Sequence, residues 1–157
     1  MTQERKDLLL KDLCGRLPYG VKVDVNGKVC SLVGLLEELV SAGYDINDFD
    51  DYALDDVKPY LRPMSSMTED EKDALLTKLT GKKYKHLFKV KRDGRVVETD
   101  DRMCKTWRSV DAMHFDYIDF CPKTIGIYTT FMYAHHFDID NLIRKGLALK
   151  APQGMYE

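Results

Sequence analysis

The chain has 157 residues, of which 44% are hydrophobic and 32% charged, enough for one ordinary hydrophobic core. Its 24 lysines and arginines nearly balance 26 aspartates and glutamates, so the formal net charge of −2 gives no overall preference for nucleic acid or anionic membranes. No apolar run approaches the roughly 18 residues that span a bilayer, and the acidic first residues are unlike a secretory signal. The composition therefore predicts a single cytoplasmic domain over residues 1–157.

The four cysteines are widely separated along the chain. Cys14, Cys30, Cys104 and Cys121 lie 16, 74 and 17 residues apart, without the close pairs that zinc ribbons and redox sites require. We expect reduced, partly buried thiols.

The first elements are a helix and a β-hairpin. Leucines among charged residues predict an amphipathic helix over residues 4–14, ended by Gly15 and Pro18. Asn26-Gly27 then separates two alternating segments, a strong hairpin signal. The expected register pairs Val25 with Lys28, Val23 with Cys30 and Val21 with Leu32, which places Cys30 in the core.

The middle of the chain predicts helices separated by a loop. Residues 35–40 resume helical spacing, and residues 45–56 contain six acidic residues and no basic one, predicting a helix or turn with a solvated acidic face. Two prolines and two serines in residues 58–67 predict an irregular loop. Thr68 and Glu71 then form a capping box that starts a helix.

The remaining elements complete an α+β chain. Residues 84–91 and 95–99 predict a second hairpin around Asp93-Gly94, residues 125–133 a strand, and residues 138–145 a closing helix. Without a βαβ rhythm, this order predicts an α+β fold with two β-hairpins plus a further strand, packed with three to five short helices.

A repeated Ala-x-His-Phe-Asp motif suggests a metal site. The motif occurs at residues 112–116 and again at 134–138, 22 residues later. Imidazole and carboxylate ligands suit iron, zinc or manganese, which could activate water. One hypothesis is therefore a metal-assisted hydrolase that uses His114, His135, His136, Asp116 and Asp138.

The same aspartates have a structural interpretation that requires no metal. If Asp138 caps a helix, Phe137 and Leu142 form a hydrophobic staple. Phe115-Asp116 with Phe120, and Tyr44-Asp45 with Phe49, fit the same local rule, although the last lacks a histidine. We therefore prefer capping to catalysis and expect no cofactor.

Basic residues gather between positions 78 and 95, where eight lysines and arginines accompany one aspartate. With interleaved Tyr84 and Phe88, this hairpin could contact a phosphate backbone and a base. The lysines could instead solvate an edge strand, or face the acidic segment 45–56 within the fold or across a homodimer.

The proline-containing loop offers a second group of binding candidates, Tyr60 and Arg62, because a stiffened loop presents its side chains in a preset shape. Together with the basic hairpin, the candidate binding residues are Tyr60, Arg62, Lys82, Lys83, Lys85, Lys89, Lys91, Arg92 and Arg95. The chain has no Gly-x-Ser-x-Gly elbow and no glycine-rich phosphate loop before a lysine.

Three segments are similar to a group of small proteins, without an established function, from Bacteroides-type gut bacteria and their prophages. They are LLLKDLCGRLPYGVKV (8–23), KPYLRPMSSMTE (58–69), and AHHFD (134–138) with Leu142-Ile143 and residues 146–149. The resemblance covers about half of the chain. It departs over residues 82–133, which read like an insertion. It implies a phage or mobile-element context, in which small accessory proteins act by binding, and it implies no catalytic residue.

The sequence thus predicts a non-catalytic accessory or binding module whose partner is a protein or a nucleic acid, not a membrane. A homodimer, a nucleic-acid contact through residues 78–95 and the metal-assisted hydrolase remain as alternatives.

Overall fold

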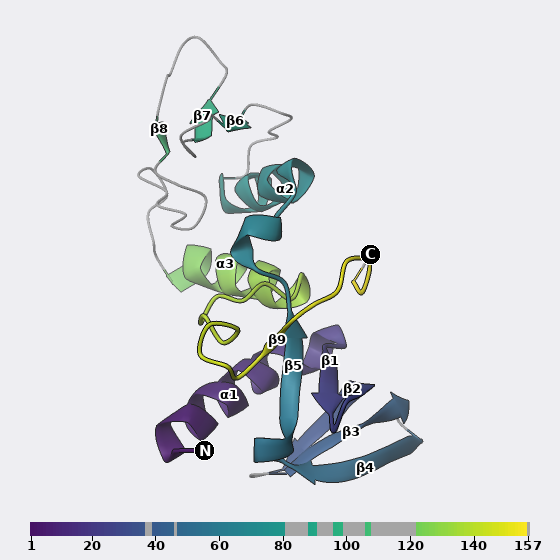
Figure 1. Cartoon of the computed structure of the whole chain (residues 1–157). Coiled ribbons are helices and arrows are strands. Elements are labelled where there is room, and N and C mark those ends of the chain that lie inside the picture. The colour runs from purple at the N-terminus through teal and green to yellow at the C-terminus, as the bar shows by residue number, and fades with distance from the viewer. Residues whose placement is uncertain are drawn as a thin grey trace. The chain divides into compact units, whose positions relative to one another are not determined.

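The computed structural model of the chain describes residues 1–36, 39–45, 47–80, 88–90, 96–98, 106–107 and 122–156. Two compact units are formed, one by Met1–Pro63 with Met132–Glu157 and one by Met64–Phe131. The described residues contain three α-helices, three 3₁₀ helices and nine strands (Figure 1). The predicted α+β class is confirmed, with more strands than the sequence indicated.

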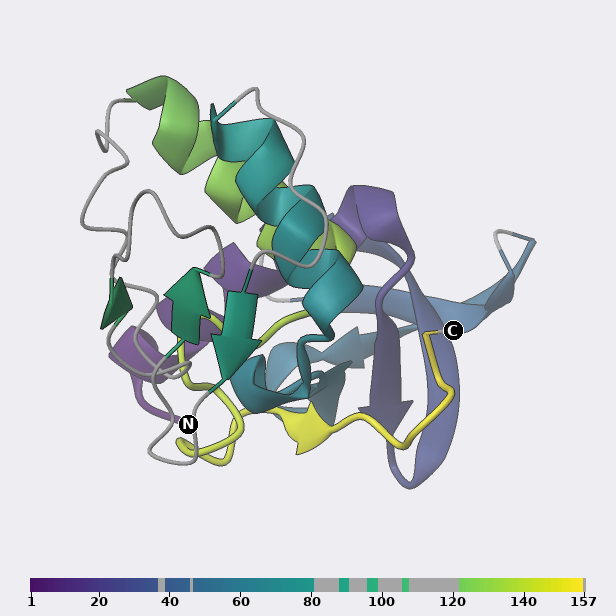
Figure 2. The same ribbon diagram turned by 90° about the horizontal axis from the view of Figure 1, so that it is seen from above.

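The first unit contains a six-stranded mixed sheet in the order β4-β3-β2-β1-β5-β9. Its strands are β1 (Lys22–Val25), β2 (Lys28–Leu36), β3 (Leu39–Asp45), β4 (Asp48–Ala53), β5 (Val57–Leu61) and β9 (Leu149–Lys150). Neighbouring strands are antiparallel except for the parallel pair β5 and β9. Figures 1 and 2 show β2, β3 and β4 as a twisted ribbon at one end of this sheet.

The predicted first hairpin is confirmed residue by residue. Val25 pairs with Lys28 and Val23 with Cys30, as expected from the Asn26-Gly27 turn. Both turn residues have positive φ, 53° and 80°, the conformation that asparagine and glycine tolerate best. Cys30 is buried in the core.

Helix α1 (Gln3–Arg16), followed by the 3₁₀ helix η1 (Leu17–Tyr19), covers the core side of the sheet. Leu9 and Leu13 of α1 pack into one cluster with the inward side chains of the strands. The same cluster contains Leu142, Leu147 and Ala148 from the segment after α3 (Pro122–Ala134). The predicted helix over residues 4–14 is confirmed and runs slightly longer.

The helix expected over residues 35–40 is wrong, and the helix or turn with an acidic face expected over residues 45–56 is only partly present. In the first segment, residues 35 and 36 belong to β2 and residues 39 and 40 to β3, where Leu35 pairs with Val40 and Leu36 with Leu39. The acidic segment forms β4 and the 3₁₀ helix η2 (Leu54–Asp56). The apolar run at residues 35–40 is too short for its periodicity to distinguish a helix from a strand. In the acidic segment, pairing with β3 outweighs the low strand preference of aspartate.

The irregular loop expected over residues 58–67 is only partly present. Residues 57–61 form β5, in which Pro59 lies opposite Val23 of β1. The 3₁₀ helix η3 (Met64–Ser66) follows. Proline removes only one donor, so a strand that pairs with β9 through other residues can accommodate it.

In the second unit, helix α2 (Glu69–Thr80) is confirmed together with its capping box. The Thr68 backbone N–H donates to the Glu71 carboxylate at 2.8 Å, and the Glu71 N–H donates to the Thr68 hydroxyl at 3.2 Å. Three short strands, β6 (Phe88–Val90), β7 (Val96–Glu98) and β8 (Thr106–Trp107), form a separate antiparallel sheet. Pairing of β6 with β7 confirms the backbone of the second hairpin.

The strand predicted over residues 125–133 is wrong, because this segment lies inside helix α3. Its β-branched and aromatic residues favour a strand, but each costs a helix only a few tenths of a kcal/mol relative to good formers. Pro122 is the first helical residue, where its missing N–H is not needed. Burial of Phe131 and Met132 adds tertiary contacts that propensity does not include.

Candidate functional site

The closing helix expected at residues 138–145 is wrong, because this segment forms bends and turns. The Asp138 carboxylate accepts hydrogen bonds from the backbone N–H groups of Leu142 at 2.7 Å and Ile143 at 3.1 Å. A helix N-cap would bond two or three residues ahead, whereas these partners lie four and five residues ahead. Asp138 therefore organises a wider turn whose apolar residues, Phe137 and Leu142, are fully buried.

Of the other two aromatic-aspartate sites, one contradicts the helix-capping rule and one is not tested. Tyr44-Asp45 lies in strand β3, so the capping interpretation is wrong there. The motif of residues 112–116, with His114 and Asp116, lies outside the described residues.

His136 occupies an unusual backbone and side-chain environment. Its φ is +59°, its side chain is buried, and its ring stacks on Tyr156 with centroids 3.8 Å apart. Its Nδ1 atom is buried without a hydrogen-bond partner in the described part of the chain. Burial, followed by the nearby charge of Arg16, lowers the pKa of His136 to about 4, so the ring is neutral at pH 7.

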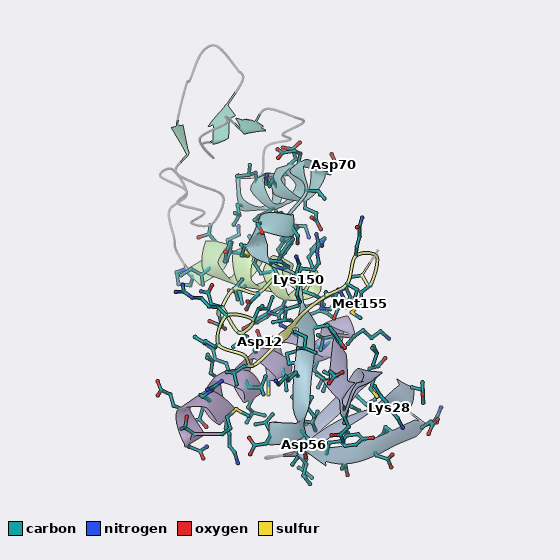
Figure 3. The ribbon with its side chains drawn as sticks, in the orientation of Figure 1. Asp12, Lys28, Asp56, Asp70, Lys150 and Met155 are labelled. Atoms are coloured by element: carbon teal, nitrogen blue, oxygen red, sulfur yellow. The ribbon has the colours of Figure 1, made fainter. Side chains whose placement is uncertain are left out.

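A buried ion pair lies at the end of α1. Arg16 donates from Nε and Nη2 to the two carboxylate oxygens of Asp12 at 2.7 and 2.8 Å, and both side chains are fully buried (Asp12 is labelled in Figure 3). Nη2 also donates to the Phe137 carbonyl at 2.7 Å, which ties α1 to the Asp138 turn. Burial raises the pKa of Asp12, and the hydrogen bond and charge of Arg16 oppose that rise.

Tyr133 completes the surroundings of this ion pair. The Arg16 guanidinium lies 4.9 Å from the centre of the Tyr133 ring. A Cβ on Gly15 would lie 2.3 Å from the same ring, so only glycine allows α1 to approach it. The Tyr133 ring, the Phe137 carbonyl and α1 therefore enclose the Asp12 and Arg16 pair. Its role is to connect these segments.

The part of the chain that the structure describes contains no set of side chains that could act as metal ligands. No group of three or more His, Cys, Asp or Glu side chains there could hold a metal ion. Asp138 already accepts two backbone hydrogen bonds. The hydrolase that would use His114, His135 and His136 stays a prediction, since half of its motif lies outside the described residues.

The two loop candidates, Tyr60 and Arg62, lie on and just after β5. The Tyr60 hydroxyl donates to Asp24 at 3.2 Å, and the Arg62 guanidinium lies 4.4 Å from the centre of the Phe137 ring. The backbone of Arg62 also donates to His136 and accepts from Asp138, at 2.8 and 2.9 Å. Both residues therefore have structural contacts within the first unit.

The basic binding candidates fall almost entirely outside the described residues. These are Lys82, Lys83, Lys85, Lys91, Arg92 and Arg95. Lys89 lies in β6, for which only the backbone is described. The nucleic-acid hypothesis for this hairpin therefore stays a prediction.

Sequence reasoning missed Asp12, Arg16 and Tyr156. For the first two a signal existed, because positions 9, 12, 13 and 16 share one face of a helix whose Leu9 and Leu13 are buried. A charged pair spaced by four residues on that face indicates a buried ion pair. No local signal marks Tyr156, whose partners lie far away in the sequence.

The face of the sheet opposite the core carries exposed apolar side chains. Alternation places Leu36 of β2, Leu39 of β3 and Phe49 of β4 on that face, where their exposed fractions are 70%, 45% and 45%. Ser41 lies between them and donates to Asp51 at 2.6 Å. This outer face is therefore partly apolar and bordered by carboxylates.

Strand β4 is the outermost strand of this sheet, and among the described residues no strand pairs with its free edge. Asp50 and Tyr52 lie opposite the buried residues Ala42 and Val40, on the core side. Phe49 and Asp51 lie on the outer side. The edge is thus acidic on both faces, and it combines these charges with exposed aromatic rings.

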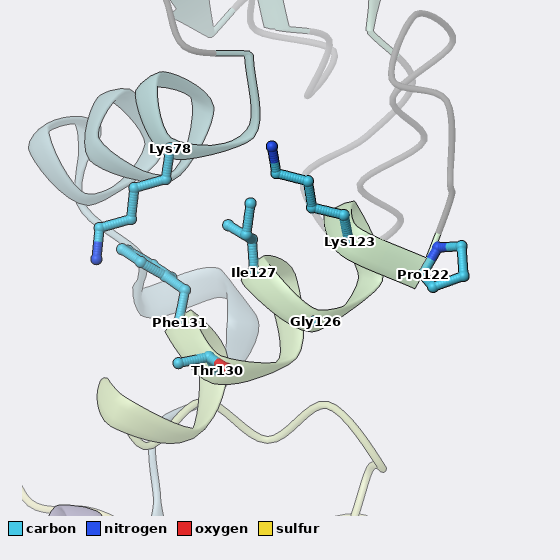
Figure 4. A pocket seen from close by; sticks show the side chains of 7 residues that line it. All are labelled: Lys78, Pro122, Lys123, Gly126, Ile127, Thr130 and Phe131. Carbon is cyan, nitrogen blue, oxygen red and sulfur yellow. The ribbon is translucent and has the colours of Figure 1, made fainter.

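A separate open pocket of about 550 Å³ lies in the second unit (Figure 4). Its lining comes from α2 and α3 and consists of Lys78, Pro122, Lys123, Gly126, Ile127, Thr130 and Phe131. Lys78, the first lysine of the basic segment, lies 5.7 Å from the centre of the Phe131 ring. The Lys78 ammonium group therefore contacts an aromatic side chain of the pocket lining.

A scan against protein-family models and searches of curated proteins and of solved structures found no match to this chain. Within the described residues, no helix combines the length and the apolar character needed to cross a membrane.

Proposed function

We propose that this chain is a non-catalytic binding module that takes a basic, extended polypeptide segment along the free edge of β4. We further propose that it acts in the cytoplasm as an accessory protein of a prophage or similar mobile element. The observation that carries the binding proposal is the composition of β4, a terminal strand with aspartates on both faces and exposed aromatic neighbours. The mobile-element context is supported by the resemblance of residues 8–23, 58–69 and 134–138.

A terminal strand offers unpaired backbone N–H and C=O groups to an added strand. The charges of β4 decide which strand can be added. If two copies of β4 paired, the aspartates of one strand (Asp48, Asp50 and Asp51) would lie opposite or diagonal to aspartates of the other. Like charges across such a pair are destabilising. The carboxylates therefore disfavour self-pairing and favour a partner with lysine or arginine.

The alternation of β4 also specifies where the partner's charges should lie. Asp50 and Asp51 point to opposite sides of the sheet, so a basic residue on each side of the added strand meets a carboxylate. Phe49 is 45% exposed and Tyr44 of β3 is 79% exposed. The Phe49 ring, on β4 itself, offers an apolar contact next to these charges, so the best partner alternates basic with apolar or aromatic residues.

The proposal is tested by titrating the chain with a fluorescent ten-residue peptide of alternating lysine and valine. We expect micromolar binding that weakens with added salt. The double variant Asp50→Lys/Asp51→Lys should weaken binding by tenfold or more, about 1.4 kcal/mol.

The control variant is Asp55→Lys/Asp56→Lys, which makes the same charge change in η2, just beyond the strand. It should reduce binding less than the β4 variant does. Equal losses in the two variants, or a dimer that excludes the peptide, would contradict strand addition at β4.

A further inference from the structure

The pairing of β1 with β5 is interrupted by a side chain. The register pairs Val23 with Pro59, Asp24 with Lys58 and Val25 with Val57, so Lys22 and Tyr60 would form the next pair. Instead, the hydroxyl of Tyr156 lies between them. It accepts from the Lys22 N–H at 2.9 Å and donates to the Tyr60 carbonyl at 2.8 Å. One phenolic oxygen thus replaces a direct bond between two strands.

The aromatic ring of Tyr156 is held as specifically as its hydroxyl. His136 stacks on it with centroids 3.8 Å apart and planes inclined by 22°. Burial raises the pKa of Tyr156 to about 12. The hydroxyl therefore stays protonated and donates its hydrogen bond to the Tyr60 carbonyl. A neutral imidazole face, one donor and one acceptor therefore converge on a single phenol.

The chain delivers Tyr156 to this position through a turn after β9. The Ala151 N–H donates to Leu61 at 2.8 Å and continues the contact with β5. The Met155 N–H then donates to Pro152 at 3.2 Å, and Gly154 has a φ of +81° (Met155 is labelled in Figure 3). The tyrosine is thus carried by a short separate segment, whereas its binding groups belong to the sheet and to the His136 turn.

We propose that the sheet has a binding site for a 4-hydroxyphenyl group where β1 and β5 separate, at Lys22 and Tyr60. Tyr156 of the same chain is the ligand that fills it. Lys22 provides the donor, Tyr60 provides the acceptor and His136 provides the stacking face. This inference concerns a different end of the sheet from β4 and does not depend on what β4 binds.

The geometry gives the site a defined selectivity. A phenol can both accept and donate, a methyl ether can only accept, and a hydrocarbon can do neither. A ligand without the hydroxyl leaves the Lys22 N–H and the Tyr60 carbonyl without that partner, and such a loss lowers affinity in a partly buried site. We therefore expect affinity to fall in the order p-cresol, 4-methylanisole, toluene.

The test uses the full chain with Tyr156→Ala, which removes the ring and leaves the other groups in place. Millimolar p-cresol should bind this variant and raise its melting temperature, because a ligand that binds only the folded state stabilises it. Toluene should bind at least about tenfold more weakly than p-cresol, because it forms neither hydrogen bond. The unmodified chain, whose site is filled by Tyr156, should show neither shift.

A second variant, Tyr156→Phe, keeps the ring and removes only the hydroxyl. Hydrogen exchange of the Lys22 amide should become at least tenfold faster in this variant than in the unmodified chain. If Tyr156→Ala is unfolded alone, recovery of structure with p-cresol and not with toluene supports the site. Equal effects of p-cresol and toluene, or unchanged Lys22 exchange in Tyr156→Phe, would overturn it.

Discussion

The two ends of the six-stranded sheet use polar residues in opposite ways. At the β5 and β9 end, Arg16, Asp12 and Tyr156 are enclosed and bonded to backbone or to one another. At the β4 end, Asp48, Asp50 and Asp51 are exposed along a strand with a free edge. Polar groups at the first end connect separate segments of the fold, whereas those at the second end lie at the surface and bond to neighbouring side chains, Ser41 and Tyr52.

This difference matters for the assignment of function. The residues with the most suggestive chemistry, His136 and Asp138, are buried among structural contacts. The acidic strand has less distinctive chemistry, yet its groups face solvent. We therefore weigh burial and existing hydrogen bonds above residue type when we propose β4 as the binding region.

The largest expected effect is loss of the buried ion pair. Asp12→Ala leaves the Arg16 guanidinium uncompensated in a site with no solvent exposure, and we expect it to lower the free energy of unfolding by about 3 to 5 kcal/mol. Urea denaturation measures this difference. The control is the surface pair of Lys72 with Glu69, in which the Glu69 side chain is 45% exposed, and Glu69→Ala should cost less than about 1 kcal/mol. Equal losses would show that the buried pair is not structural.

The next largest effect separates the two faces of β2. Leu32 is 5% exposed on the core side, and Leu36 is 70% exposed on the outer side. Leu32→Ala should destabilise by about 2 to 4 kcal/mol, because it removes contacts and leaves a cavity. Leu36→Ala should change stability by less than about 0.5 kcal/mol. A large loss in Leu36→Ala would mean that the outer face is covered.

A pH effect of intermediate size is expected from His136. Its pKa is lowered from 6.5 to about 4 in the folded chain, so folding favours the neutral ring. This contribution is fully present above pH 6.5 and is lost as the pH falls towards 4. Since one pKa unit corresponds to about 1.4 kcal/mol, we expect this contribution to be on the order of 2 to 3 kcal/mol.

His136→Phe keeps a ring on Tyr156 and removes the titration. The difference between the two stability curves isolates His136, because Asp12 and the other carboxyl groups remain in both chains. We expect that difference to change between pH 6.5 and 4. A constant difference across this range would contradict a neutral, buried imidazole.

The smallest effect on stability is expected at the β4 edge. Asp50→Lys/Asp51→Lys removes exposed charges and the hydrogen bonds from Tyr52 and Ser41, so the free energy of unfolding should change by less than about 1 kcal/mol. The urea midpoint measures this. A loss as large as that of Leu32→Ala would indicate that these aspartates support the fold.

The parts of the fold that could be predicted from the sequence are those set by local chemistry. Asn26-Gly27 accepts positive φ, which fixed the register of the first hairpin, and Thr68 with Glu71 satisfies the first N–H groups of α2. Both signals act within four residues. Pro122 at the first position of α3 is a local signal of the same kind.

The candidate site could be predicted only in part, because its contacts join distant positions. Arg16 reaches Phe137, and Tyr156 reaches Lys22 and Tyr60. No short pattern encodes these pairs. The acidic content of residues 45–56 was visible, but its placement on a terminal strand depends on pairing with β3.

Backbone hydrogen exchange at β4 tests the central claim most directly. The amides of Asp48–Ala53 that point away from β3 have no strand partner among the described residues. When the lysine and valine peptide binds, these amides should become protected, with little change in the core strand β1. Binding that leaves all of the β4 amides unprotected would contradict the account.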